Sequence, residues 1–230
     1  WIGSTQLGLG AETTRIYTRN GKSISYGERE RENYSFYLQD EWTPSAKWLI
    51  IPAARIESSD SFGSEFIPKI GATYFGAADW RIKASAGKGY RIPTILELYR
   101  RNASGSMVGN PDLGAEISKS YEIGFEKDWE KHTGKISFYR NEVKDLIISK
   151  QVKAPVYTWI NAEEALLSGI EVSTTHKLSK EFDLRLGYNY LDAEDTEEDE
   201  RLEGRPRHQF TFGGTYRPIN SDWKFSLDGN

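Results

Sequence analysis

The sequence predicts an all-β fold: an antiparallel, up-and-down transmembrane β-barrel, of which this chain forms a part. Three observations predict it. Apolar and polar residues alternate along many segments, the connections between these segments are short and long in turn, and tryptophans gather near the short connections.

Composition excludes several other classes of protein. The net charge of −4 over 230 residues provides no basic face for a nucleic acid. No stretch has the roughly 20 apolar residues that a membrane-spanning helix needs. A chain with no cysteine has neither disulfide bonds nor thiolate metal sites.

Alternation with a period of two defines the individual strands. In residues 182–190 every second residue is apolar, and the residues between them are polar or glycine. Successive side chains of a strand point to opposite faces, so each such segment has one apolar and one polar face. No segment shows the periodicity of a helix. The eleven expected strands cover approximately residues 5–17, 34–42, 47–57, 65–75, 80–90, 117–127, 135–148, 157–177, 182–194, 206–217 and a last one from residue 222.

The connections alternate strictly in length. Short turns are expected at residues 43–46, 76–79, 128–134, 178–181 and 218–221. Longer polar connections are expected at residues 18–33, 58–64, 91–116, 149–156 and 195–205. Strands of about 10–13 residues are long for a soluble sandwich but suit a tilted bilayer crossing. Short turns at one rim and longer loops at the other are typical of outer-membrane barrels.

Aromatic residues indicate where the membrane interfaces lie. Of the seven tryptophans, five lie close to a short turn: Trp42, Trp48, Trp80, Trp129 and Trp223. Because indole prefers the headgroup level of a bilayer, these side chains are expected to form a girdle at one interface. A second ring is expected from Tyr17, Tyr34, Tyr90, Tyr157 and Tyr190. The alternative is that these aromatic residues cap the core of a soluble β protein.

Charged residues on the second face of the strands favour a water-filled or plugged lumen. They are Arg81, Lys83, Glu122, Glu126, Glu171 and Arg185. A β-structure in lipid has no open edge, and single-chain bacterial barrels use even strand numbers. Eleven strands, and an N-terminus without an initiator methionine, therefore predict that residues 1–230 are a single, partial barrel domain from the interior of a longer chain.

Several segments resemble the barrel of the TonB-dependent outer-membrane receptors. That family has a mid-barrel strand ending in glycine–aromatic–Arg–x–Pro, then a Glu-Leu-Tyr element, which here are residues 89–93 and 97–99. The family's Asn-Pro-Asp-Leu…Glu…Ser…Tyr-Glu-Ile-Gly stretch is similar to residues 110–124. Residues 37–42, 138–147 and 161–172 also agree, in the same order, so the resemblance covers nearly the whole chain.

The resemblance implies a barrel of about 22 strands around an N-terminal plug, with these residues forming roughly strands 9 to 19. The plug and the C-terminal closing strands would then lie outside residues 1–230. It implies uptake of a scarce, large nutrient, a ferric siderophore or a cobalamin, across the outer membrane of a Gram-negative bacterium. The resemblance does not distinguish between the vitamin B12, catecholate-siderophore and colicin-receptor branches of the family.

The implied partners follow from the same resemblance. They are outer-membrane lipid and lipopolysaccharide, the TonB complex acting through the plug, the transported siderophore or cobalamin, and a colicin or phage. No cofactor and no enzymatic reaction are expected, because the receptor moves its ligand without changing it.

Residues 91–116 are the best candidate for ligand contact. Four polar residues cluster beside Tyr99: Arg91, Arg100, Arg101 and Asn102. Arginines near an aromatic ring can bind an anionic, aromatic ferric chelate through charge-assisted hydrogen bonds and cation–π contacts. The alternative is a solvated loop, or contacts of these arginines with lipopolysaccharide phosphates.

No metal site or catalytic group is predicted. His132, His176 and His208 lie in different hairpins without metal-ligand spacing. The acidic residues between positions 192 and 200 lack the pattern of a calcium loop and are interpreted as solvated charges. The alternatives to a receptor are a passive porin-like channel, an outer-membrane barrel enzyme and a soluble all-β binding module. For an enzyme, His208 beside Arg207 and the acids of residues 192–203 are the only weak candidates.

Overall fold

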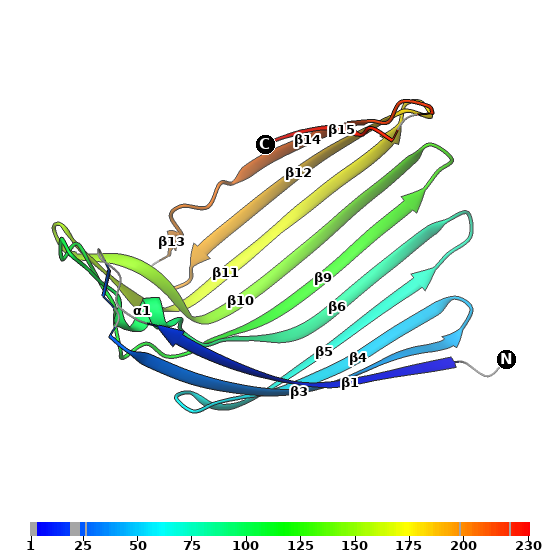
Figure 1. The fold of residues 1–230 in the computed structure, drawn as a ribbon. Coiled ribbons are helices and arrows are strands. Elements are labelled where there is room, and N and C mark those ends of the chain that lie inside the picture. The colour runs from blue at the N-terminus through cyan, green and yellow to red at the C-terminus, as the bar shows by residue number, and fades with distance from the viewer. Residues whose placement is uncertain (1–3, 19–23, 26, 198, 221) are drawn as a thin grey trace.

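A computed structural model describes residues 4–18, 24–25, 27–197, 199–220 and 222–230. These residues form one sheet, in which eleven long strands lie side by side in chain order. The sheet curves into a trough, with hairpin turns at one rim and the longer connections at the other (Figure 1). The predicted antiparallel, up-and-down arrangement is confirmed.

The eleven long strands form the wall of the trough. They are β1 (Ser4–Thr18), β3 (Arg29–Ser45), β4 (Trp48–Ser59), β5 (Gly63–Phe75), β6 (Trp80–Arg91), β9 (Glu116–Asp128), β10 (His132–Lys153), β11 (Val156–Lys177), β12 (Phe182–Asp195), β14 (His208–Tyr216) and β15 (Phe225–Gly229). The connections contain the two-residue strands β2 (Ile24–Ser25), β7 (Arg101–Asn102), β8 (Met107–Val108) and β13 (Glu200–Arg201), and the helix α1 (Ile95–Tyr99). No described helix has the length and apolar character needed to cross a membrane.

Register assigns the apolar side chains to one face of the wall. Residues opposite each other on neighbouring strands share a face, and one apolar row therefore crosses seven strands. This row is Tyr74, Ile82, Phe125, Ile136, Val172, Tyr188 and Phe210. Most large side chains of this face are exposed, for example 67% for Leu9 and Phe210 and 71% for Leu227. A sheet face of exposed, large apolar side chains is suited to lipid rather than water.

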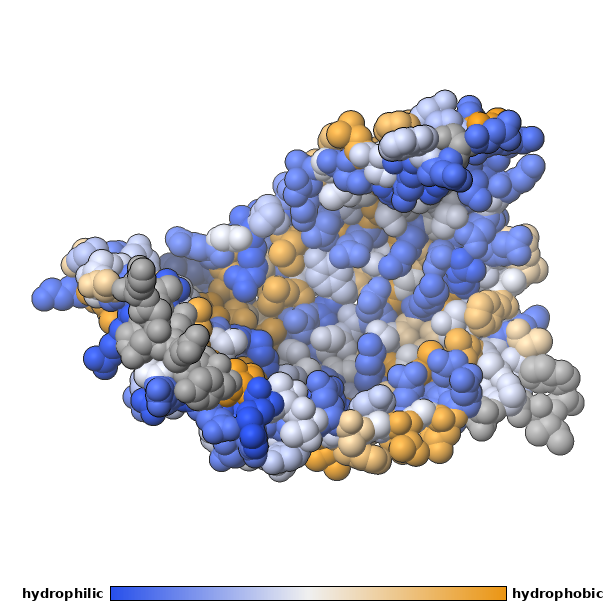
Figure 2. All heavy atoms as spheres, in the orientation of Figure 1, coloured by the Kyte–Doolittle hydropathy of each residue, from blue (hydrophilic) through white to orange (hydrophobic). Residues whose placement is uncertain are grey.

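The opposite face is polar and lines the trough (Figure 2). All six charged residues predicted for a lumen lie on this face by register. Near the turn rim, Arg81 donates hydrogen bonds of 2.6 Å to both Glu126 and Asp128, and Lys83 donates one of 2.6 Å to Glu126. The charges of this face thus neutralise one another across strands.

Two of the predicted long connections are short turns at the tips of long hairpins. β4 continues to Ser59 and β5 begins at Gly63, and β10 continues to Lys153 with β11 beginning at Val156. The predictions of loops at residues 58–64 and 149–156 were therefore wrong. In the β10–β11 hairpin, both faces are covered, so its apolar residues form a continuous run instead of alternating.

The buried apolar residues of the described chain gather at the loop rim, in two clusters. The first consists of Val143, Leu146, Ala162, Ala165, Ala193 and Leu202. The second consists of Leu98, Leu113 and Ile147, with Phe62, Tyr99 and Trp159 packed against it. Since Leu146 and Ile147 belong to different clusters, the hairpin is sandwiched between residues 92–115 and 199–207. We call this layered assembly the platform: residues 92–115, 143–165 and 199–207.

Candidate functional site

The platform begins with the one-turn helix α1, which the sequence analysis did not predict. Thr94 Oγ1 accepts a hydrogen bond of 3.2 Å from the backbone N–H of Glu97, and the Glu97 carboxylate accepts one of 2.7 Å from that of Thr94. This reciprocal pair is a capping box, and it anchors a helix that buries Ile95 and Leu98. Five residues are too few to show a helical period, but the Thr-x-x-Glu spacing was a readable signal.

Arg91, at the end of β6, joins the platform to the adjoining strand β9. Its Nε and Nη2 each donate a hydrogen bond of 2.6 Å to Glu116, and its Nη1 lies 3.0 Å from Glu97 Oε2. Glu116 also accepts a 2.7 Å hydrogen bond from the backbone N–H of Ile147. The bidentate pair therefore ties the end of β6 to α1, β9 and β10. All three guanidinium nitrogens of Arg91 therefore donate hydrogen bonds within the protein.

The same contacts affect the titration of Glu97. Burial by itself raises its pKa, but the hydrogen bonds from Thr94 and Arg91 outweigh burial, and the pKa lies below its ordinary value. The carboxylate of Glu97 is therefore ionised at neutral pH. Its charge stabilises both the helix N-terminus and the Arg91 contact.

Arg31, which the sequence analysis did not single out, lies buried under α1. Its side chain reaches from β3 and donates a 2.5 Å hydrogen bond to the carbonyl oxygen of Pro93. The residue is only 6% exposed, and its guanidinium lies 6.0 Å from the ring centre of Phe62. Burial lowers the pKa of Arg31, against the attraction of Asp60. Because Pro93 is 62 positions away, no local pattern could reveal this contact.

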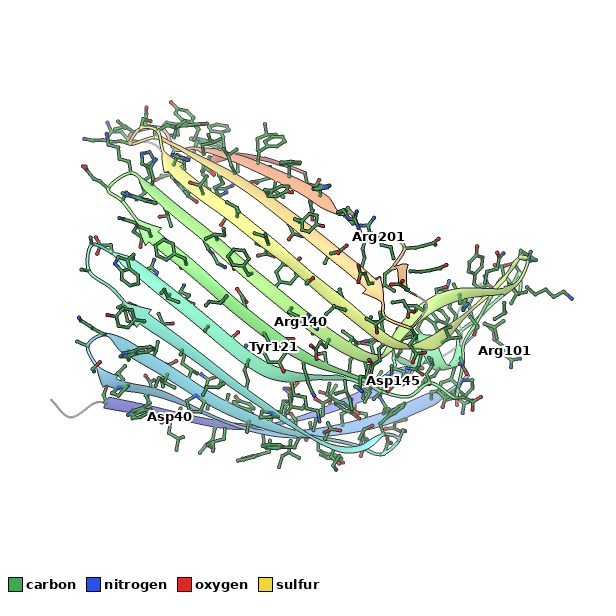
Figure 3. All side chains as sticks on the ribbon, turned by 180° about the vertical axis from the view of Figure 1, so that it is seen from behind. Asp40, Arg101, Tyr121, Arg140, Asp145 and Arg201 are labelled. Carbon is green, nitrogen blue, oxygen red and sulfur yellow. The ribbon has the colours of Figure 1, made fainter. Side chains whose placement is uncertain are left out.

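The predicted ligand residues fall into different environments. Tyr99 is half-buried, with the Arg29 guanidinium 4.4 Å from its ring centre. Arg100 is half-buried, and its Nε has no hydrogen-bond partner among the described residues. Arg101 is exposed and lies near the outer tip of the platform (Figure 3).

Asn102 and Arg91 have structural contacts. The Asn102 side chain donates a 2.8 Å hydrogen bond to Ser106 Oγ and accepts one of 2.9 Å from the Met107 backbone N–H. These bonds close the turn between β7 and β8. The structure thus places Arg29 over the ring of Tyr99 and uses Arg91 and Asn102 to hold the segment.

Two asparagines attach residues 109–115 to the long hairpin. Asn110 Nδ2 donates a 3.0 Å hydrogen bond to the carbonyl of Trp159. Asn161 Oδ1 accepts a 2.9 Å hydrogen bond from the Gly114 N–H, and its Nδ2 donates one of 2.7 Å to the carbonyl of Asp145. The connection between β6 and β9 is therefore an ordered layer on the hairpin rather than a solvated loop.

A cavity of about 850 Å³ lies on the other side of the hairpin. It is lined by charged residues of both signs, including Lys150, Arg201 and Arg205 and the acids Asp195 and Glu200. Among the described residues, no group of three or more His, Cys, Asp or Glu side chains could hold a metal ion. Of the acidic run, Asp195, Glu197 and Glu200 line this cavity.

The five predicted girdle tryptophans all lie near the turn rim. Trp48 is 5.0 Å from Tyr74, and Tyr74 is 5.5 Å from Trp80, between ring centres. Trp42, Trp129 and Trp223 are also exposed. The position of these rings is that of an interface girdle, and their contact with a membrane stays a prediction.

The predicted second ring is less regular. Tyr34 is exposed, but Tyr90 donates a 3.4 Å hydrogen bond to the Phe62 carbonyl, and Tyr157 pairs with β8 in the platform. The Tyr17 side chain lies outside the described ones. Tyr121, on the apolar face near Arg140 (Figure 3), is an exposed aromatic at this level that the sequence analysis missed.

Comparison with known proteins relates this arrangement to a family. The family model described as TonB dependent receptor-like, beta-barrel matches residues 2–230. The vitamin B12 transporter BtuB of Photobacterium profundum is 29% identical over 226 residues, which are 96% of this chain and 36% of that protein. A second BtuB, from Vibrio vulnificus, is 27% identical over 216 residues, 91% of this chain and 34% of the relative.

Solved structures share the fold. The siderophore receptor PirA from Pseudomonas aeruginosa superimposes with a TM-score of 0.73 at 20% identity, over 98% of this chain and 42% of that one. The described chain thus has the fold of these receptors. It spans only about a third of the length of the curated relatives that it matches, 36% and 34%.

Proposed function

This chain belongs to the TonB-dependent receptor-like β-barrel family, and from that premise we propose that it forms the wall and mouth of a nutrient-uptake receptor in the Gram-negative outer membrane. The receptor takes up a scarce, large nutrient, either a cobalamin or a ferric siderophore. Energy reaches the receptor from the TonB complex through a plug that lies outside residues 1–230. The chain performs no chemistry on its ligand.

The two-faced wall is the observation that carries this proposal. One face exposes rows of large apolar side chains, and the other holds paired charges such as Arg81 and Glu126. A closed barrel of such strands presents its apolar face to lipid and encloses a wet lumen. We infer that the eleven described strands are half of a barrel of about 22, completed by strands outside this chain.

The platform supports a binding site at the mouth of that barrel. Arg29, Tyr99 and Arg100 gather there, with Arg101 exposed nearby. Arginine and tyrosine suit an anionic or aromatic ligand such as a ferric chelate. Cobalamin is the first candidate to test, because the relatives at 29% and 27% identity are named vitamin B12 transporters.

Further partners are proposed from position alone. Lipid and lipopolysaccharide would surround the apolar face, on which Tyr121 and Arg140 are register partners (Figure 3). A colicin or a phage would reach the receptor through the exposed platform.

Uptake measurements test the proposal. The gene for the full-length protein is deleted in its host, and uptake of labelled cyanocobalamin and of ferric siderophores is compared before and after collapse of the proton-motive force. We expect energy-dependent uptake of one ligand class to disappear in the deletion strain. Unchanged uptake of every ligand would overturn the proposal, and uptake that survives de-energisation would indicate a passive channel.

The mouth site is tested by substitution in the full-length receptor. Replacing Arg100 and Arg101 with alanine should weaken ligand binding by about tenfold, the effect of losing roughly 1.4 kcal/mol of charge-assisted contact. Arg217→Ala is the matched control, since Arg217 pairs with Asp183 at the opposite rim. Equal ligand affinity in all variants would show that Arg100 and Arg101 do not contribute to the binding site.

A further inference from the structure

Two histidines that are 44 positions apart in the chain face each other at the turn rim. His132 begins β10 and His176 lies near the end of β11, and the two are direct register partners. The prediction that they lie in different hairpins was therefore wrong, because β10 and β11 form one long hairpin. Their Nδ1 atoms are 2.6 Å apart, and their ring centres are 4.5 Å apart. His132 is exposed and His176 is half-exposed, so water and ions can reach the pair.

The surrounding hydrogen bonds determine which nitrogen of His176 carries the proton. Thr174 Oγ1 donates its only hydrogen to the carbonyl oxygen of Thr133, at 3.0 Å. The same oxygen lies 3.1 Å from His176 Nε2 and can therefore only accept a hydrogen there. Nε2 of His176 thus carries the proton, and its Nδ1 accepts the Nδ1–H of His132. When a metal ion enters between the rings, the His132 proton moves through solvent to its own Nε2, so that both Nδ1 lone pairs face the ion. A second hydrogen bond that orients a ring in this way is characteristic of histidines that bind metals.

The spacing of the two Nδ1 atoms is close to that of two metal ligands. Imidazole nitrogens bind zinc at about 2.0–2.1 Å, so two of them at a tetrahedral angle lie about 3.3 Å apart. The rings need to separate by less than about 1 Å to admit an ion, which small side-chain rotations of exposed rings provide. The backbones need not move, since both strands continue in register beyond the pair.

Strand alternation and the preceding turn define the position of the histidine pair on the wall. By strand alternation both histidines lie on the apolar face of the wall, at its edge, while the neighbouring Lys177 points to the opposite face. The turn before His132 is held by a 2.7 Å hydrogen bond from the Trp129 N–H to the His132 carbonyl. His132 therefore sits at the junction of the girdle and water.

We propose that His132 and His176 form a binding site for a divalent transition-metal ion that favours imidazole, such as Ni²⁺, Cu²⁺ or Zn²⁺. Two neutral nitrogens without carboxylates suit these ions and do not suit Ca²⁺ or Mg²⁺, which need oxygen ligands. Water molecules complete the coordination of the ion, because the described residues supply no third ligand of the usual kinds. The site lies at the opposite rim from the ligand-binding platform and does not depend on the proposed uptake function.

Ni²⁺ binding to the full-length receptor in detergent tests the proposal. Calorimetric titration of the parent is compared with His132→Ala, His176→Ala and the control His208→Ala. His208 is a suitable control because its Nδ1 hydrogen-bonds the Tyr188 hydroxyl instead of a second histidine. We expect each of the first two variants to lose one bound Ni²⁺ per chain, and His208→Ala to keep it.

A second variant separates metal binding from a general loss of structure. Thr174→Val removes the oxygen that orients His176, and it should weaken Ni²⁺ binding by about 10-fold or more while both ligands remain. Heat-modified migration on gels verifies that every variant is folded. If folded His132→Ala and His176→Ala bind Ni²⁺ with the stoichiometry and affinity of the parent, the proposal is wrong.

Discussion

The platform and the wall place large apolar side chains in opposite environments. In the platform, Leu98 and Leu113 are 4% exposed and pack into a core, as they would in a water-soluble domain. In the wall, Leu9 is 67% exposed and faces outward from a sheet that has no second layer. This difference is what we expect of a wall that lies in lipid and a platform that lies in water. In that arrangement lipid would replace a core along the wall, whereas the platform supplies its own core.

The largest expected difference between the two regions comes from truncating a leucine in each. Leu98→Ala should destabilise the platform by about 3–5 kcal/mol, because it loses buried contacts and leaves a cavity. Leu9→Ala should cost only about 1–2 kcal/mol, since lipid fills the space and only the transfer term is lost. Urea titration of the full-length protein in lipid vesicles, with hydrogen exchange over residues 92–115, measures both. Equal costs would show that the two leucines share one environment.

A charge on the wall tests which face meets lipid. Ile123 lies midway along β9 on the apolar face, and Ile123→Arg should cost about 2–4 kcal/mol in a bilayer. The adjacent Glu122 faces the trough, and Glu122→Arg should change the folding free energy by no more than about 0.5 kcal/mol. The same vesicle titration measures the pair. If both variants fold as stably as the parent, the apolar face is not in lipid.

Breaking an ion pair should cost more folding free energy in the interior of the platform than at its surface. Arg91→Met leaves Glu97 and Glu116, whose side chains are only 14% and 13% exposed, without their cation. We expect a loss of about 2 kcal/mol, reduced from the buried-pair range because Arg91 itself is partly exposed.

The control for Arg91→Met lies at the same rim. Lys144→Met breaks the pair of Lys144 with Glu164, in which both side chains are at least half exposed. No measurable change in stability is expected, because solvent screens such a pair. A similar loss in both variants would show that Arg91 is no more than a surface residue.

The smallest expected effect is a pH dependence confined to the platform. The folded-state pKa of Glu97 is below its ordinary value of 4.5, so its contribution is complete above that value. As the pH falls through the folded-state pKa, the carboxylate is protonated and the contribution is lost. The protection factors of residues 94–99, in which the slower intrinsic exchange of amides in acid is corrected for, should fall below about pH 4.5. Glu97→Gln should abolish this acid dependence, and a dependence that persists in this variant would assign it to another group.

The sequence alone predicted the number, order and faces of the wall strands. Alternation is local, so residues 182–190 reveal both faces of β12 without any knowledge of their neighbours. The tryptophans near the turns were located in the same way. The same reasoning failed in the β10–β11 hairpin, because a strand covered on both faces does not alternate, and at α1, because one helical turn has no period.

The contacts that make up the sites were decided by the tertiary structure. His132 reaches His176 because strand register pairs positions that are 44 residues apart. Arg31 reaches Pro93, 62 positions away, because the connection after β6 packs against β3. Arg91 looked like a ligand-binding residue in the sequence, and its partners Glu97 and Glu116 show that it holds the platform together. Local periodicity determines which face a side chain occupies, whereas register and loop packing determine what it meets there.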